Sequence, residues 1–138
     1  MKTFVAVAAV ATAASAGIHF AVAPEHFHEW WGFGTFFVAC GVAQLVWAAF
    51  PSSAVIGIGG NAALIALWAF SRTTGLPFGP EAGMPEAMGP LDVASVLLEG
   101  AAVVALVWNR VAASAQSIPF PHIQEENACF ARARATSR

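Results

Sequence analysis

Four long apolar runs dominate the hydrophobic pattern of the chain. They cover residues 3–23, 30–50, 54–71 and 91–108. Each run has about 20 residues, enough for a helix that rises about 1.5 Å per residue to cross a hydrocarbon core about 30 Å thick. Lipid offers no hydrogen-bond partner to the backbone, and the runs lack the strict alternation of a barrel strand, so helices are predicted. The pattern therefore predicts an all-α membrane protein, an antiparallel four-transmembrane-helix bundle within residues 1–110.

The connections between the runs differ in length and composition. Residues 51–53, with the sequence PSS, predict a tight turn with a serine cap, which would make the helices on either side antiparallel neighbours. Residues 72–90 are rich in Gly and Pro and predict a long outer loop that is ordered but not helical. Residues 111–138 are more polar and predict a mobile cytoplasmic tail. Small residues at Ala9, Ala13 and Gly17 would let the first helix approach a neighbour closely.

The composition narrows the class of protein. The 138 residues are 58% hydrophobic and only 10% charged, whereas a soluble domain has about 25% charged residues. A net charge of −2 gives no basic surface for nucleic acid. No nucleophile is accompanied by a recognisable base, so an enzyme is disfavoured. The lipid bilayer is the first partner that the sequence predicts.

The basic residues predict the orientation of the helices. One basic residue, Arg72, falls between the outer ends of two runs, and the others fall on the side of the chain termini: Lys2, Arg110, Arg132, Arg134 and Arg138. The excess of positive charge predicts that both termini are cytoplasmic. Residues 14–16, with the sequence ASA, also resemble a signal-peptide cleavage site, which would leave three spans. The apolar run continues beyond this site to residue 23, and we therefore favour an uncleaved first span.

Two stretches resemble a known group of proteins. They are residues 17–27, GIHFAVAPEHF, and residues 71–80, SRTTGLPFGP. Both are similar to segments of small four-helix integral membrane proteins of bacteria for which no activity is established. The similarity covers about residues 17–110. It implies a multi-pass protein of the bacterial plasma (inner) membrane, and it implies no catalytic residues.

Ionisable and polar residues inside the apolar runs are the first candidates for a functional site, because burying such groups in a bilayer is energetically unfavourable. The set is His19, Asn61, Arg72, Asp92, Ser95 and Glu99. One interpretation is structural: Arg72 pairs with Asp92, Glu99 bonds to Asn61 or Ser95, and His19 bonds to a backbone carbonyl. The other is a polar cavity that is open to the outside, in which Glu99 carries a proton or binds a cation. Gln44 and Cys40 are expected to be packing residues.

A metal site near the outer face is a second hypothesis. Histidine suits Cu or Zn, and methionine suits Cu(I). The candidate ligands are His19, His26, His28, Glu25, Met84 and Met88. Pro24 and Glu25 are also a helix-start signal, and within a helix His26 and His28 would point about 200° apart, which weakens a shared site. Haem would need His19 with a histidine of the connection and is disfavoured.

Three functions remain open from the sequence. The preferred one is an accessory or structural subunit of a larger membrane assembly, with a membrane-protein partner or a second copy of the chain. The first alternative is a metal-handling protein that uses the outer histidines. The second is a small proton-coupled or cation transporter that uses Glu99.

Overall fold

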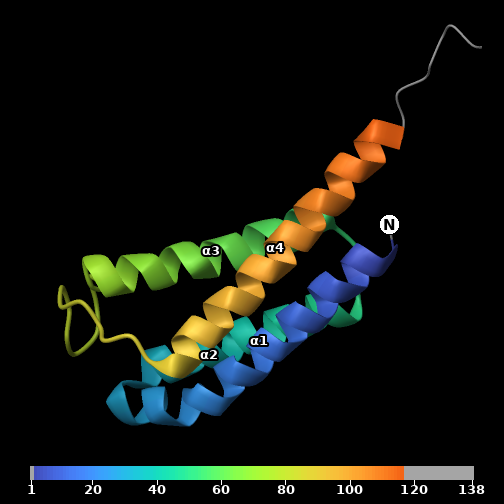
Figure 1. Ribbon diagram of the computed structural model, residues 1–138. Helices are drawn as coiled ribbons and strands as arrows, with labels where there is room; N and C mark the ends of the chain where they lie inside the picture. Colours follow the sequence, from blue (N-terminus) through green and yellow to red (C-terminus); the bar gives the residue numbers. More distant parts are fainter. Residues whose placement is uncertain (1, 117–138) are drawn as a thin grey trace, which may run out of the picture.

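The computed structural model describes residues 2–116, and these residues form four helices (Figure 1). The helices are α1 Lys2–Glu29, α2 Trp31–Ala49, α3 Ala54–Thr73 and α4 Pro90–Gln116, with no strand in the described range. Each helix is long and apolar enough to cross a membrane. The predicted class, an all-α membrane bundle with several spans, is confirmed.

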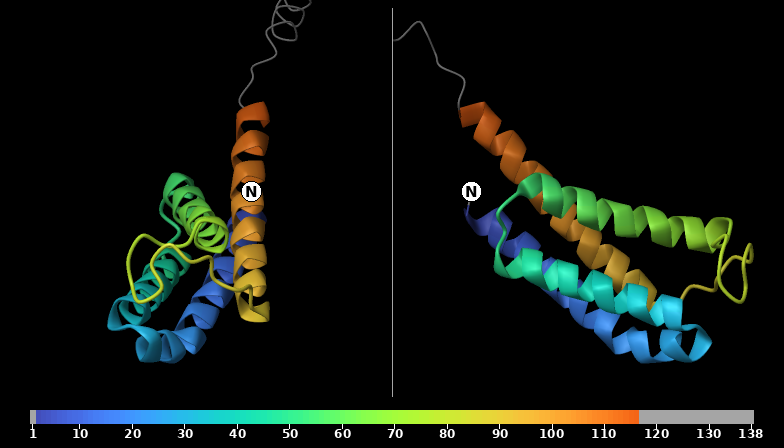
Figure 2. Two further views of the ribbon diagram at one scale, coloured as in Figure 1. Left: turned by 90° about the vertical axis from the view of Figure 1, so that its left-hand side faces the viewer. Right: turned by 180° about the vertical axis from the view of Figure 1, so that it is seen from behind.

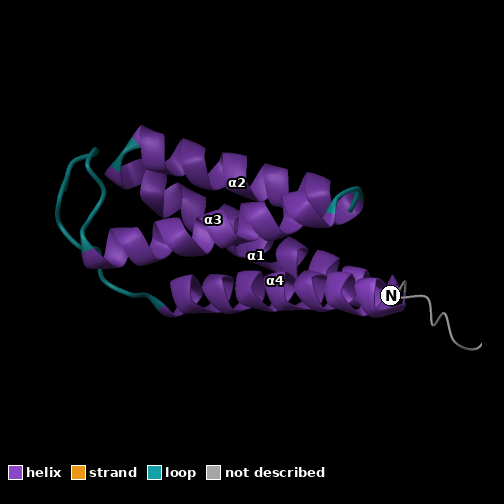
Figure 3. Cartoon of the chain, turned by 90° about the horizontal axis from the view of Figure 1, so that it is seen from above, coloured by secondary structure: helices purple, strands orange, loops and turns teal. Residues whose placement is uncertain are grey.

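The ends of the bundle are made by different kinds of connection. At one end lie the junction at Trp30 and residues 74–89, and we call this the loop end. At the other end, the terminal end, lie the start of α1, residues 50–53 and the last turns of α4 (Figure 3). Helix α4 continues to Gln116, past the predicted boundary at residue 110. Residues 117–138 of the predicted tail lie outside the described residues.

Helix α1 is longer than its apolar run. Pro24, which the sequence suggested as a helix start, instead lies inside α1, and the helix ends at Glu29. The break comes at Trp30, whose backbone is extended (φ −165, ψ 133). Proline removes one backbone hydrogen bond from a helix and bends it, and Figure 1 shows α1 changing direction towards its end. The 28 residues of α1 span about 42 Å, so this helix reaches beyond the hydrocarbon core or tilts within it.

The helices do not all pack equally. Helix α1 lies against both α2 and α4, and α3 lies against α4 (Figure 2). Helices α2 and α3 are antiparallel and share few backbone contacts, although a short turn joins them. Ser53 caps α3, as predicted, by accepting a hydrogen bond from the Ile56 N–H at 3.5 Å. Trp47 fills the space beside Gly57 and donates to the Ser53 carbonyl at 3.0 Å.

The core of the terminal half is built mainly from alanines, with two large side chains, Trp47 and Leu106. Its members are Ala8, Ala11, Trp47, Ala102, Ala105 and Leu106. The buried face of α1 therefore differs from the predicted seam: Gly17 is exposed, and Ala9 and Ala13 are only half-buried. The face that turns inward carries Thr12, Ser15 and His19. Small side chains let helices approach within van der Waals contact in a bilayer, and α1 uses this closeness to bring polar groups together.

Residues 74–89 form an ordered cap over the loop end, as predicted. Gly75, Gly79 and Gly83 have positive φ values of 75, 97 and 78, which glycine adopts without strain. The Gly83 N–H donates to the Leu76 carbonyl at 2.7 Å, which closes the segment on itself. Gly79 lies against the ring of Phe33 of α2, where a Cβ would approach Phe33 Cζ to 2.6 Å. The cap is thus fitted to the end of α2.

Candidate functional site: a buried carboxyl group below a cavity

Glu99 of α4 lies at the centre of a polar cluster inside the bundle, and only 1% of the residue is exposed. Its Oε1 atom accepts hydrogen bonds from Ser15 Oγ at 3.0 Å, from Gln44 Nε2 at 3.1 Å and from Ser95 Oγ at 3.5 Å. The donors come from α1, α2 and α4. Burying a carboxyl group in a bilayer is energetically unfavourable unless it has hydrogen-bond partners. The cluster supplies these partners to Glu99 from neutral side chains, without an adjacent Lys or Arg in the described residues.

The cluster continues into α3 through Asn61. Gln44 Nε2 also lies 3.4 Å from Asn61 Oδ1, and Asn61 Nδ2 donates to Thr12 Oγ1 at 3.3 Å and to the Gly57 carbonyl at 2.8 Å. All four helices therefore contribute a side chain. We call Thr12, Ser15, His19, Gln44, Asn61, Ser95 and Glu99 the inner cluster.

Hydroxyl groups form a short chain that leads to Glu99. Ser15 Oγ and Ser95 Oγ are 2.8 Å apart, and each lies within hydrogen-bond distance of Glu99 Oε1. A hydroxyl donates one hydrogen and accepts others. When Ser15 donates to Glu99, Ser95 is free to donate to Ser15. Such a chain can reverse its direction when the carboxyl group gains or loses a proton.

His19 faces the carboxyl group from α1. Its Nε2 atom lies 3.3 Å from Glu99 Oε1, and the residue is 6% exposed. The two atoms are close but not aligned as a hydrogen bond, and neither ring nitrogen of His19 has a hydrogen-bond partner within residues 2–116. The bond to a backbone carbonyl, which one of the two sequence interpretations assigned to His19, is therefore not formed within residues 2–116. The contact becomes an ion pair only when His19 is protonated and Glu99 is ionised.

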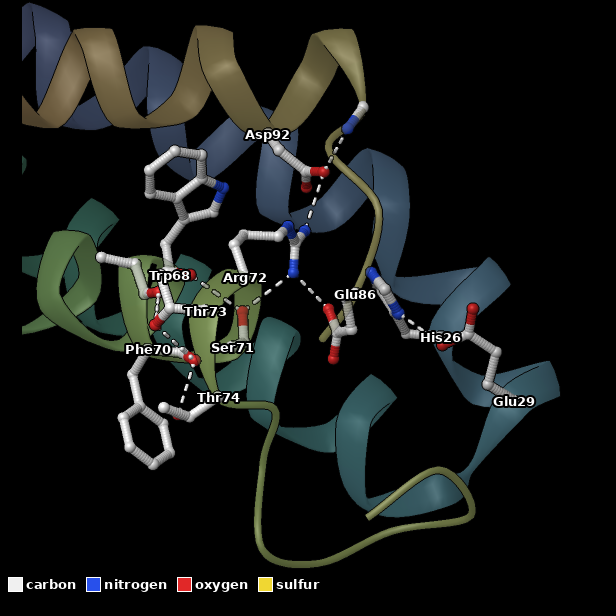
Figure 4. A network of polar contacts seen from close by, with 12 residues as sticks. His26, Glu29, Trp68, Phe70, Ser71, Arg72, Thr73, Thr74, Glu86 and Asp92 are labelled. Carbon is white, nitrogen blue, oxygen red and sulfur yellow. Dashed lines mark hydrogen bonds and ion pairs between the residues drawn. The ribbon is translucent and has the colours of Figure 1, made fainter. Parts of the chain in front are cut away.

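A second cluster lies nearer the loop end and centres on Arg72 at the end of α3. Its Nη2 atom donates to Asp92 Oδ2 at 2.8 Å, and its Nη1 atom pairs with Glu86 Oε2 and donates to Ser71 Oγ at 2.8 Å (Figure 4). Asp92 also accepts from the Gly89 N–H at 2.8 Å, and the Glu86 N–H donates to the Ser71 carbonyl at 3.1 Å. We call Ser71, Arg72, Glu86 and Asp92 the rim cluster, because it ties residues 74–89 to α3 and α4.

A cavity of about 160 Å³ lies between the two clusters. His19, Ser95 and Glu99 line its floor, and Arg72, Glu86 and Asp92 line its upper part. Aromatic side chains form much of the remaining wall: Trp30, Phe33, Phe36, Phe37, Trp68 and Phe78. The cavity shares Arg72, Glu86, Asp92 and His26 with a wider hollow of about 730 Å³ under residues 74–89. The cavity therefore extends from Glu99 to residues of the loop end and adjoins the wider hollow there, and the core around Ala102 and Leu106 lies on the other side of Glu99.

In the described part of the chain, the candidate metal ligands do not form a recognisable metal-binding group, although Glu25, His26, Met84 and Met88 all line the wider hollow. His26 Nδ1 bonds to Glu29 Oε2 at 2.8 Å, and its ring stacks on Phe37 with centroids 4.1 Å apart. Glu25 and His28 are exposed on the last turns of α1. Met84 and Met88 are 61% and 68% exposed in the cap. Within residues 2–116, no group of three or more His, Cys, Asp or Glu side chains is arranged to hold a metal ion.

The predicted polar set thus separates into two places. His19, Asn61, Ser95 and Glu99 belong to the inner cluster, whereas Arg72 and Asp92 belong to the rim cluster. The sequence interpretation missed Thr12, Ser15 and Glu86, and it treated Gln44 as a packing residue. Gln44 instead donates hydrogen bonds inside the cluster. Thr12, Ser15 and His19 follow a spacing of three and four residues, which is one helix face, and this spacing could have revealed the polar side of α1.

Fold and site together define a class: a four-helix, multi-pass membrane protein with a buried carboxyl group below a cavity that reaches the loop end. Comparison of the chain with known protein families, with curated proteins and with solved structures finds no match. The site itself therefore carries the functional argument.

Proposed function

We propose that this protein binds a proton or a small cation within the membrane, at Glu99, and exchanges it with the loop end. One observation carries the proposal: the Glu99 and His19 side chains line the floor of a cavity that continues to the loop end. Ionisable residues inside a membrane bundle are rare, and they mark ion and proton pathways. This develops the cation-transport alternative that the sequence left open.

The surroundings of Glu99 can accommodate its carboxyl group in both the protonated and the ionised form. Hydroxyl and amide donors stabilise the ionised carboxylate, and the hydroxyl groups of Ser15 and Ser95 can turn to follow a proton. His19, 3.3 Å away, can hold a proton when Glu99 gives one up. The rim cluster offers two carboxylates against one guanidinium, so a cation approaching from the loop end is attracted.

A role as a subunit of a larger assembly is supported by the one-sided shape of the cavity. Its lining residues stop at Glu99 and His19, and below them lies the core around Ala102 and Leu106. Passage of an ion through the whole membrane would then need a rearrangement or a partner that completes the path. We expect a fixed partner to co-purify in mild detergent, and native mass spectrometry that finds only the isolated chain would contradict this role.

For the orientation, we propose that the loop end faces away from the cytoplasm, and that the membrane is the inner membrane of a bacterium. Lys2 and Arg110 lie on helices at the terminal end, and the positive-inside rule then makes both termini cytoplasmic. A Met84→Cys variant in a Cys40→Ala, Cys129→Ala background should react with a membrane-impermeant thiol reagent added outside intact cells. Reaction only after the cells are opened would reverse the orientation.

The central test is an infrared titration of purified protein in lipid nanodiscs. We expect a carboxyl band that changes between its protonated and ionised forms, and that disappears in Glu99→Gln because the amide cannot titrate. Glu81→Gln is the matched control, since Glu81 is exposed in the cap. A titrating buried-carboxyl band that persists in Glu99→Gln, or that is absent from the wild type, would overturn the proposal.

A further inference from the structure

The cavity above Glu99 combines aromatic walls with carboxylates, and this combination bears on the kind of cation that it accepts. Phe37 belongs to α2 and Trp68 belongs to α3, and both side chains line the cavity together with Glu99. The rings of Trp30 and Phe33 meet edge to face, with their centroids 5.0 Å apart. The ring centroid of Phe78, in the cap, lies 6.4 Å from that of Trp30. Aromatic rings therefore form part of the walls and of the top of the space, and aliphatic side chains form the rest of its apolar lining.

The charge of the lining favours a cation over an anion. Glu86, Asp92 and Glu99 supply three carboxyl groups, and Arg72 supplies the one guanidinium among the described lining residues. Arg72 is already paired with Glu86 and Asp92. Glu99 at the floor has polar donors but no Lys or Arg partner within the described residues, so it is the carboxyl group left to balance an incoming charge.

The lining is poorly suited to a bare metal ion or sodium ion. Such ions need several oxygen ligands to replace their water, whereas most of the wall here is carbon. The negative face of an aromatic ring attracts an organic ammonium ion, which carries its charge on a weakly hydrated, apolar surface. A cavity on the order of 150 Å³ holds a molecule of about six heavy atoms, and this one measures about 160 Å³.

We propose that the cavity is a binding site for a small organic ammonium ion, with Glu99 as its counter-charge and Phe37 and Trp68 as cation–π walls. This inference rests on the proposed function, because it names the class of cation that Glu99 binds. The ammonium ion enters from the loop end past the rim cluster, and a proton on Glu99 competes with it. A neutral molecule of the same shape gains neither the carboxylate nor the ring contribution.

The experiment is a fluorescence titration of the full chain in nanodiscs with tetramethylammonium chloride, since Trp68 and Trp30 report on the cavity directly. We expect a saturable change in tryptophan emission at constant ionic strength. Sodium chloride and tert-butanol, a neutral molecule of similar size, should not reproduce it. Trp68→Phe should remove much of the signal, whereas Trp108→Phe should keep it, because Trp108 is 60% exposed and lies outside the cavity lining.

Two variants separate the contribution of the carboxylate to binding from that of the aromatic rings. Glu99→Gln should abolish saturable binding. Phe37→Leu, which keeps the carboxyl group and fills similar space, should weaken binding by roughly threefold to thirtyfold, the range that cation–π contributions imply. Circular dichroism and a single elution peak in detergent check that each variant is folded. Tetramethylammonium binding that is unchanged in folded Glu99→Gln and Phe37→Leu would overturn the inference.

The test also distinguishes this inference from the proposed function. If the infrared band of Glu99 titrates but tetramethylammonium does not bind, the ammonium site is wrong and proton or inorganic-cation binding stands. If tert-butanol binds as tightly as tetramethylammonium, charge plays no part and the inference is again wrong. If the Glu99 band is absent and no cation binds, both proposals fail together. Weaker tetramethylammonium binding at lower pH, in step with the Glu99 band, would support both.

Discussion

Single polar side chains decide how the interior of this bundle is organised, and Gln44 shows this most clearly. Its Nε2 atom lies within hydrogen-bond distance of Ser15 Oγ, Asn61 Oδ1 and Glu99 Oε1, at 3.4, 3.4 and 3.1 Å. An amide nitrogen carries two hydrogens, so these three acceptors share two donors. Gln44 thereby links α2 to the other three helices through one group.

Replacing Gln44 by leucine should destabilise the bundle, because Glu99 and Asn61 each lose a donor while remaining buried. We expect a loss of about 1 kcal/mol in the free energy of unfolding, the scale of a hydrogen bond between helices in a bilayer. Unfolding in mixed micelles measures it. Thr35→Val is the matched control, since Thr35 is exposed and bonds only to the Trp31 carbonyl. Equal losses in both variants would show that Gln44 has no special role.

At the scale of the elements, α2, α3 and α4 approach one another closely near the terminal end, and this contact holds the helices in place. Gly57 of α3 lies against Trp47 of α2 and Leu106 of α4, so one small residue brings three helices together. The apolar runs and the turn at residues 51–53 could be predicted because hydrophobic length and turn chemistry are local properties. The inward face of a helix is harder to predict, because inside lipid both faces are largely apolar and the hydrophobic pattern loses its contrast. Helix α1 is the exception, since the spacing of Thr12, Ser15 and His19 marks its inward face.

Gly57→Ala should test this contact. A Cβ at position 57 would lie 2.3 Å from Trp47 Cζ2 and 2.8 Å from Leu106 Cδ1, and such overpacking costs about 1–3 kcal/mol. Gly59→Ala is the control on the same helix, because nothing lies within 4 Å of its Cβ position. There the better helix propensity of alanine should leave stability unchanged or raise it by up to about 1 kcal/mol. Measured melting temperatures in detergent should fall for the first variant alone.

For the molecule as a whole, the rim cluster joins the cap to the bundle. Arg72 contacts Glu86 of the cap and Asp92 of α4, and its side chain is 11% exposed. The same residues line both the wide hollow and the cavity above Glu99. The stability of the cap and access to the cavity therefore depend on the same ion pairs.

Arg72→Ala should loosen the cap, because Glu86 and Asp92 lose their shared partner and repel each other. We expect amide hydrogen exchange in residues 74–89 to speed up by about tenfold, which corresponds to about 1.4 kcal/mol. Arg72→Lys should restore only part of the protection, since lysine cannot bond two carboxylates with a planar fork. Arg110→Ala, an exposed position on α4, should change nothing in the cap. Unaltered exchange in Arg72→Ala would mean that the glycine turns alone order these residues.

By itself, the sequence determined the class of the protein, the number of apolar helices long enough to span a membrane and the ionisable residues that lie within them. These follow from hydrophobic length and composition, which do not depend on how the helices meet. Only the tertiary structure decided that Glu99 meets Ser15, His19 and Gln44, and that Arg72 stays with Glu86 and Asp92 at the rim. It also decided that no three His, Cys, Asp or Glu side chains within residues 2–116 are arranged to hold a metal ion. Those groupings depend on the rotation of each helix about its axis and on the continuation of α1 through Pro24. The rotation of α1 is set by contacts between residues far apart in the chain, such as that of Ser15 with Glu99.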